Sequence, residues 1–85
     1  MRFELFGIAR ARAGREAVDT DAATLGASLR QLAEICPGLV PEILHDGALA
    51  HGYLASLNGD RFVSDGATPV GDSDTVLILG AQAGG

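Results

Sequence analysis

The stretch that decides the fold is the apolar run Thr75-Val76-Leu77-Ile78-Leu79, which is followed by Gly80-Ala81-Gln82-Ala83-Gly84-Gly85. The run is β-branched and aliphatic with no polar alternation, and this pattern predicts a strand that is buried on most of its surface. The segment after it carries very little side-chain area. Ordering such residues gains little against a backbone entropy cost of about 1–2 kcal/mol per residue. We therefore expect a mobile tail after the last strand.

The end of this tail has a chemical use. Gly84 and Gly85 have no Cβ atom, so a free tail that ends in them can enter a narrow channel. The terminal carboxylate of Gly85 would then reach the reactive groups of another protein. The alternative interpretation is a frayed terminus that ends in glycine by chance, because the chain has 12 glycines among its 85 residues.

Length and composition predict one small folded domain with a single core. Apolar residues make up 47% of the chain, which argues against intrinsic disorder. The net charge is −5 and no basic block is present, so binding to nucleic acid or to an anionic membrane is disfavoured and basic partners are favoured. A single cysteine, Cys36, and an N-terminus without an apolar block together predict a cytoplasmic protein with no signal peptide.

The first half of the chain predicts a hairpin and a helix. Residues 2–9 are expected to form a strand, residues 10–15 a turn that contains three arginines, and residues 16–19 a short return strand. These arginines would either contact an acidic partner or phosphate, or simply be solvated. Apolar residues then recur at helical spacing from Leu25 to Cys36, with Thr24 as the expected N-cap, Asp21 as the alternative, and Pro37-Gly38 as the stop.

The second half predicts an irregular crossover, two short strands and the final strand. Strands are expected at Tyr53–Leu57 and Arg61–Val63, joined by a tight turn at Asn58-Gly59. The crossover carries His45, Asp46 and His51, which are metal-ligand types. Their spacing matches no metal signature, so we expect no metal site.

These elements together predict an α+β fold in which one main helix packs on one face of a mixed sheet. A long final strand that is apolar on both faces is best placed in the middle of the sheet, parallel to the first strand. This is the arrangement of a β-grasp, or ubiquitin-like, domain. We expect the domain to cover residues 1–80 and a flexible tail to cover residues 81–85.

One face of the final strand should stay uncovered by the helix. Either Leu77 and Leu79 face the helix and Val76 and Ile78 face away, or the reverse holds. An uncovered apolar patch beside the tail would dock a partner, unless the crossover folds over it. The residues that we assign to partner binding are Phe6, Ile8, Val76, Ile78 and Ala83.

Several motifs together resemble the MoaD/ThiS family of ubiquitin-like sulfur carriers. They are Leu5-Phe6-Gly7 with Arg12, the helix with Leu29 and Leu32, the Asn58-Gly59 turn, Thr68-Pro69-Val70-Gly71-Asp72-Ser73-Asp74-Thr75-Val76, and Ala83-Gly84-Gly85. The resemblance covers nearly the whole chain. Chain length favours the branch of the molybdopterin synthase small subunit, or the related carrier of cysteine biosynthesis.

The resemblance implies a sulfur carrier that is not itself an enzyme and binds no cofactor. An E1-like adenylyltransferase would use ATP to activate the carboxylate of Gly85, and a sulfur donor would convert it to a thiocarboxylate, with Gly84 giving access. The sulfur would then pass to a second protein, either the molybdopterin synthase large subunit or another sulfur-accepting enzyme.

Two other functions remain open from the sequence. A protein modifier would be joined through Gly85 to lysines of other proteins, although this chain has no lysine of its own to receive such a bond. A plain interaction module would keep its binding after deletion of Gly84 and Gly85.

Overall fold

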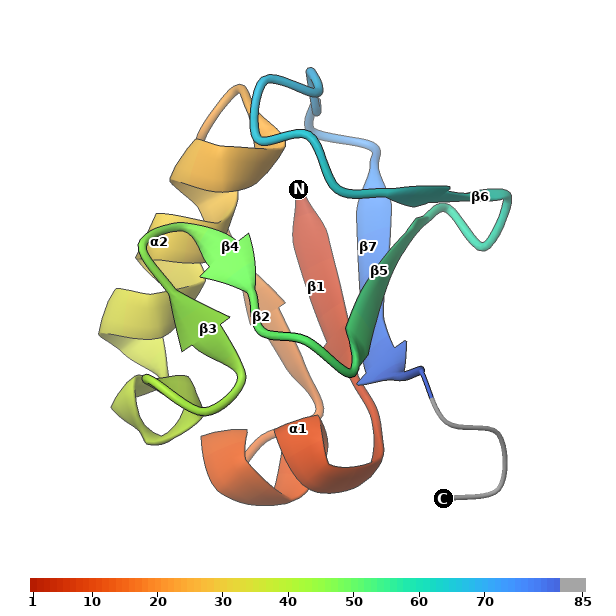
Figure 1. Cartoon of the computed structure of the whole chain (residues 1–85). Helices are drawn as coiled ribbons and strands as arrows, with labels where there is room; N and C mark the ends of the chain where they lie inside the picture. The colour runs from red at the N-terminus through yellow and green to blue at the C-terminus, as the bar shows by residue number, and fades with distance from the viewer. Residues whose placement is uncertain (82–85) are drawn as a thin grey trace.

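A computed structural model describes residues 1–81, and five strands form its main sheet in the order β2-β1-β7-β5-β6 (Figure 1). The final strand β7 is central, parallel to β1 and antiparallel to β5. This confirms the predicted place of the final strand. The bounds are β1 Arg2–Leu5, β2 Ala17–Asp19, β5 Tyr53–Leu57, β6 Arg61–Val63 and β7 Thr75–Gly80.

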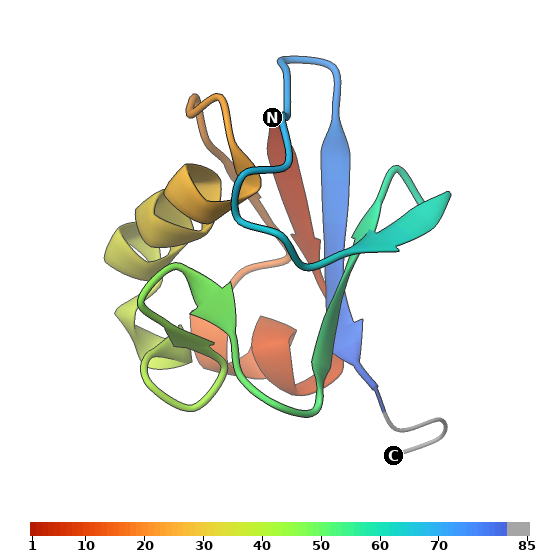
Figure 2. The ribbon, with the colours of Figure 1, turned by 45° about the horizontal axis from the view of Figure 1, so that its top comes forward.

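The main helix α2 runs over Leu25–Ile35 and packs on one face of this sheet (Figures 1 and 2). Thr24 caps it as predicted, because its side-chain oxygen accepts a hydrogen bond from the backbone N–H of Ala27 at 3.3 Å. The helix ends before a short 3-10 turn, η1, at Pro37–Leu39. Its buried stripe meets the inner face of the sheet in the core, which includes Phe3, Leu5, Leu25, Leu29, Leu32, Leu57, Val76 and Ile78.

A second helix, α1, covers Gly7–Ala13, where the sequence had predicted the rest of a strand and a turn. The prediction was wrong because Phe6 and Ile8 alternate with smaller residues as they would in a strand, although the alanines and arginines that follow favour a helix. Gly14 ends α1 in the left-handed conformation, and its N–H donates to the carbonyl of Arg10 at 3.0 Å. Strands β1 and β2 still pair antiparallel, but a helix joins them instead of a tight turn.

The three arginines therefore lie on or just after a helix. Arg10 pairs with Glu16 at 3.3 Å, and Arg12 pairs with Glu42. These are exposed pairs of the kind that contributes little to stability.

The crossover contains a small hairpin that the sequence did not predict. Strands β3, Leu44–His45, and β4, Ala48–Leu49, pair antiparallel, and Asp46 and Gly47 make the turn with φ angles of 53° and 73°. Figures 1 and 2 show this hairpin on the same side of the sheet as α2. Within residues 1–81 the opposite sheet face has no helix or hairpin over it, so the crossover does not cover that face.

A set of hydrogen bonds closes the end of the sheet opposite the tail. The side chain of Asn58 donates to Asp74 Oδ1 at 3.0 Å and accepts from the N–H of Thr75 at 2.8 Å. The N–H of Gly71 donates to Asp74 Oδ2 at 2.8 Å. The Asn58-Gly59 turn and the turn at Gly71-Asp72-Ser73-Asp74, which are separate motifs in the sequence, are thus hydrogen-bonded to each other.

These bonds lower the pKa of Asp74, mainly through the Asn58 side chain and then through the Gly71 N–H. A lowered pKa means that the carboxylate stabilises the fold above its ordinary value of 3.8, and that this contribution is lost as the pH falls through the lower folded value. We expect Asp74→Asn to lower the urea midpoint at pH 7, because the amide cannot accept both bonds.

Urea unfolding at several pH values checks this prediction. The gap in urea midpoint between the wild type and Asp74→Asn should narrow as the pH falls below 3.8. The neighbouring Asp72→Asn is the matched control and should show only a small gap at every pH. A gap for Asp74→Asn that does not change with pH would contradict the role of the charge.

Candidate functional site

The candidate site lies at the point where the chain leaves the sheet at the end of β7. On one side, the N–H of Phe6 donates to the carbonyl of Ile78 at 3.1 Å, and the chain then turns away into α1. On the other side, Gly80 pairs with Tyr53, and the N–H of Ala81 donates to the carbonyl of Gly52 at 2.8 Å. The chain therefore exits between the start of α1 and the turn that precedes β5.

The strand register determines which side chains flank this exit on the open face of the sheet. Leu79 lies opposite Leu54 of β5, and Leu77 lies opposite Ser56, which in turn lies opposite Phe62 of β6. Phe6 is still in extended conformation and follows Leu5, the partner of Ile78, so it falls beside Leu79. We call this set the open-face patch: Phe6, Leu54, Phe62, Leu77 and Leu79.

The open-face patch combines accessible aromatic rings with half-buried leucines. Phe6 is 40% exposed and Phe62 is 65% exposed. The guanidinium of Arg10 lies over the Phe6 ring, 5.8 Å from its centroid, and its Nε donates to the carbonyl of Leu5 at 3.1 Å. Clustered exposed apolar residues of this kind are typical of a surface that binds another protein.

The other half of the open face is charged. Arg2 and Glu4 of β1 approach each other at 3.4 Å, and Arg2 also lies 4.0 Å from Asp19 of β2. The face thus changes from charged residues on β2 and β1 to apolar residues on β7, β5 and β6. Such an arrangement gives a partner both a contact area and a direction of approach.

Several solved structures match this architecture over nearly the whole chain. The crystal structure of SAMP1 from Haloferax volcanii matches with a TM-score of 0.83 at 24% identity, covering 99% of this chain and 97% of that one. The BexX/CysO complex from Amycolatopsis orientalis matches with a TM-score of 0.78 at 26% identity, covering 99% and 98%. CysO from Mycobacterium tuberculosis matches with a TM-score of 0.76 at 26% identity, covering 95% and 98%.

The chain has the ubiquitin-like β-grasp fold. Its neighbours are small ubiquitin-like carrier or modifier proteins rather than enzymes, and they agree with the resemblance to MoaD/ThiS-type sulfur carriers. They do not single out the molybdopterin branch. No family model matches the sequence, and no curated protein matches it.

Two of the residues assigned to partner binding lie inside the β-grasp core. Val76 and Ile78 are 0% exposed and face α2, so their assignment to the open face was wrong. The opposite alternative holds, with Leu77 and Leu79 on the open face. The signal was present in the sequence, because Thr75 shares a face with Leu77 and Leu79, and a polar residue marks the less buried side.

The other predicted site residues have different outcomes. Phe6 belongs to the open-face patch, and Ile8 lies on α1 with 59% exposure. Ala83, Gly84 and Gly85 lie outside the described residues. Sequence reasoning missed Leu54 and Phe62, although Leu54 precedes the buried Ala55 and Phe62 precedes the buried Val63.

The remaining candidate groups of the β-grasp domain have structural explanations. Cys36 is buried in the core, and this burial raises the pKa of its thiol, so it is a packed side chain and not a reactive thiolate. His45 lies 3.3 Å from Asp46 on the surface. In the described part of the chain, no three histidine, cysteine, aspartate or glutamate side chains are grouped so as to hold a metal ion, and no helix is long and apolar enough to cross a membrane.

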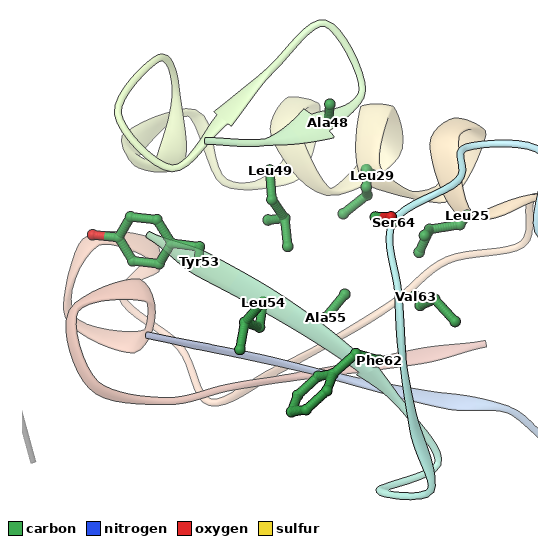
Figure 3. Close-up of a pocket in the computed structure, with 10 residues that line it drawn as sticks. All are labelled: Leu25, Leu29, Ala48, Leu49, Tyr53, Leu54, Ala55, Phe62, Val63 and Ser64. Carbon is green, nitrogen blue, oxygen red and sulfur yellow. The ribbon is translucent and has the colours of Figure 1, made fainter. Parts of the chain in front are cut away.

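A groove of about 280 Å³ lies on the inner side of β5, between that strand and the layer formed by α2 and β4 (Figure 3). Leu29 and Leu49 point toward β5 from above, whereas Leu54 and Phe62 lie on the other side of that strand. Ser64 and Tyr53 are the polar residues among its ten lining residues. Leu54 and Phe62 of the open-face patch are also among the lining residues, so the groove reaches the patch at this edge of the sheet.

Proposed function

We propose that this chain is a sulfur carrier whose C-terminal Gly85 is converted to a thiocarboxylate. The observation that carries the proposal is the path of the chain at its end. The central strand β7 leads from the core, past an exposed apolar patch, to a segment that ends in Gly84-Gly85. The fold shared with CysO and SAMP1 supports the same function.

The chemistry would be divided between this chain and its partners. A carboxylate is a poor electrophile, so an E1-like enzyme would join Gly85 to the α-phosphate of ATP and release pyrophosphate. Sulfide would then attack the acyl carbon and displace AMP, leaving the thiocarboxylate. This chain would supply an accessible carboxylate and a docking surface, while positioned catalytic groups would belong to the partners.

The open-face patch is the proposed docking surface for the activating enzyme and for the sulfur-accepting enzyme. That one neighbour was solved as a BexX/CysO complex supports the view that carriers of this fold bind partner proteins. For the acceptor, the sequence favoured molybdopterin. Because two neighbours are named CysO, we favour the other alternative, in which the carrier supplies sulfur for the synthesis of cysteine or another sulfur metabolite.

A second function is conjugation to other proteins through Gly85. The observation that favours it is the match to SAMP1, whose name is small archaeal modifier protein 1. The two functions share the adenylation step and differ only in the nucleophile that attacks the activated Gly85. A lysine amine would give an isopeptide bond, and sulfide would give the thiocarboxylate.

Intact mass spectrometry tests the proposed function. Protein from its native cells, or protein incubated with an E1-like enzyme, ATP and sulfide, should be heavier by the difference between one sulfur and one oxygen atom. Variants that lack Gly84 and Gly85, or that carry Gly85→Leu, should keep their unmodified mass. Conjugates on a denaturing gel would indicate the modifier, and an unmodified wild type under all conditions would contradict both functions.

A further inference from the structure

We propose that Gly52 is a positioning residue for the tail, because its carbonyl accepts a hydrogen bond from the N–H of Ala81. The inference rests on the proposed function, since it concerns how the carboxylate of Gly85 is presented to an activating enzyme. It assigns a role to the turn before β5, which lies far from Gly85 in the sequence and has no reactive side chain at this position.

The end of β7 is hydrogen-bonded differently to its two neighbours in the sheet. Toward β1, the last bond is the one from Phe6 N–H to the carbonyl of Ile78, at 3.1 Å, because α1 begins at Gly7 and leaves the sheet. Toward β5, the pairing continues through Gly80 and ends with Ala81 N–H bonded to Gly52 at 2.8 Å. Among residues 1–81, the last hydrogen bond to the chain after β7 therefore comes from one side of the sheet only. Its acceptor is the Gly52 carbonyl.

The conformation of Gly52 explains why a glycine stands there. Its φ is +96°, a region that residues with a side chain rarely adopt. The turn around it is closed by a bond from Tyr53 N–H to the carbonyl of Ala50 at 3.2 Å. A Cβ at Gly52 would meet no atom within 4 Å, so the glycine is needed for its backbone angle and not for space. The angle is what turns the carbonyl toward β7.

The bond also sets the length of chain available to the partner. From the N–H of Ala81 to the carboxylate of Gly85 the chain has five residues, which span at most about 18 Å when fully extended. The carboxylate of Gly85 must therefore react within that distance of the bond to Gly52. Fixing the starting point of a short segment lowers the entropy that a partner must remove when it binds the tail. Loss of the bond should thus weaken binding before the chemical step.

The chain offers a matched control for Gly52→Ala. Gly59 flanks the other end of β5 and has a φ of +67°, and a Cβ placed on it would likewise meet no atom within 4 Å. Gly52→Ala and Gly59→Ala should therefore strain the backbone in similar ways at opposite ends of one strand. We expect Gly52→Ala to raise the KM for adenylation about tenfold with little change in kcat, and Gly59→Ala to change it less than about twofold.

A double-mutant cycle isolates the bond itself. Ala81→Pro removes the N–H donor, and Ala81→Ser keeps it. If both Gly52→Ala and Ala81→Pro act by breaking one bond, the double variant should show about the same tenfold effect as either single variant. Hydrogen exchange at the Ala81 amide gives a readout without the enzyme, and should become faster in Gly52→Ala but not in Gly59→Ala.

The outcomes separate this inference from the proposed function. Wild-type activation together with equal KM values for Gly52→Ala and Gly59→Ala would overturn the role of Gly52 and leave the sulfur carrier standing. Additive effects of Gly52→Ala and Ala81→Pro would also overturn it. A wild-type chain that is never activated would overturn the proposed function and, with it, the inference.

Discussion

Leu79→Asp is expected to lower kcat/KM for the proposed adenylation of Gly85 by about 30-fold or more, while the domain stays folded. Leu79 lies at the centre of the open-face patch, between Phe6 and Leu54 and directly before the exit of the tail. Hot-spot residues, which cluster near the centre of an interface, cost about 2 kcal/mol or more of binding free energy when they are truncated. A charge placed there would have to be buried against the partner without a counter-ion.

Steady-state adenylation kinetics, with circular dichroism to verify folding, measure this effect. Leu79 is only partly buried, so its replacement should not unfold the domain as a charge at Ile78 would. Leu79→Met is the conservative control and should keep most of the activity because it preserves an apolar side chain of similar volume. If Leu79→Asp is folded and as active as the wild type, the open-face patch is not the surface that the activating enzyme contacts.

Gly38→Ala is expected to cause the largest loss of stability among simple glycine substitutions. A Cβ at Gly38 would collide with the backbone carbonyl oxygen of Arg12, where η1 packs against α1. Backbone atoms cannot rotate away as the end of a side chain can. Overpacking of this kind costs about 1–3 kcal/mol, and we expect a value near the upper end.

Thermal unfolding checks this prediction, because each 1 kcal/mol shifts the Tm of a domain of this size by roughly 4–8 °C. Gly80→Ala is the control, since a Cβ at Gly80 would meet no atom within 4 Å and its φ is not in the left-handed region. Its Tm should be unchanged or slightly higher. Equal Tm values for the two variants would show that α1 and η1 can separate without cost.

The elements predicted correctly from the sequence are those whose ends or positions are marked by residues with a strong local preference. Thr24 and Pro37 mark the ends of α2, Asn58-Gly59 makes the tight turn, and the apolar run places β7 in the centre of the sheet. Helix α1 was not predicted because it is only seven residues long, and helices of that length depend on tertiary contacts. Its contacts come from the buried Ala9 and from the approach of Gly38, which is distant in sequence.

The candidate site was predicted only in part, because its composition also depends on contacts between segments that are distant in sequence. The apolar character of β7 was evident, but the face that each side chain occupies depends on its neighbours in the sheet. Phe3 lies beside Val76 in the parallel pair, and both are fully buried beneath α2. Leu54 and Phe62 join the patch only through the pairing of β5 with β7 and with β6. Strand pairing across the chain is not encoded in any one segment.

The central position of β7 also has a consequence for synthesis of the protein. Strand β1 is made first, yet its Arg2 pairs with Thr75 and its Leu5 with Ile78, so the sheet stays in two parts until β7 has left the ribosome. A product terminated before β7 would lack the strand that joins β1 to β5 and would expose its core residues to proteases. Only a chain translated through Thr75–Gly80 can therefore complete the five-stranded sheet.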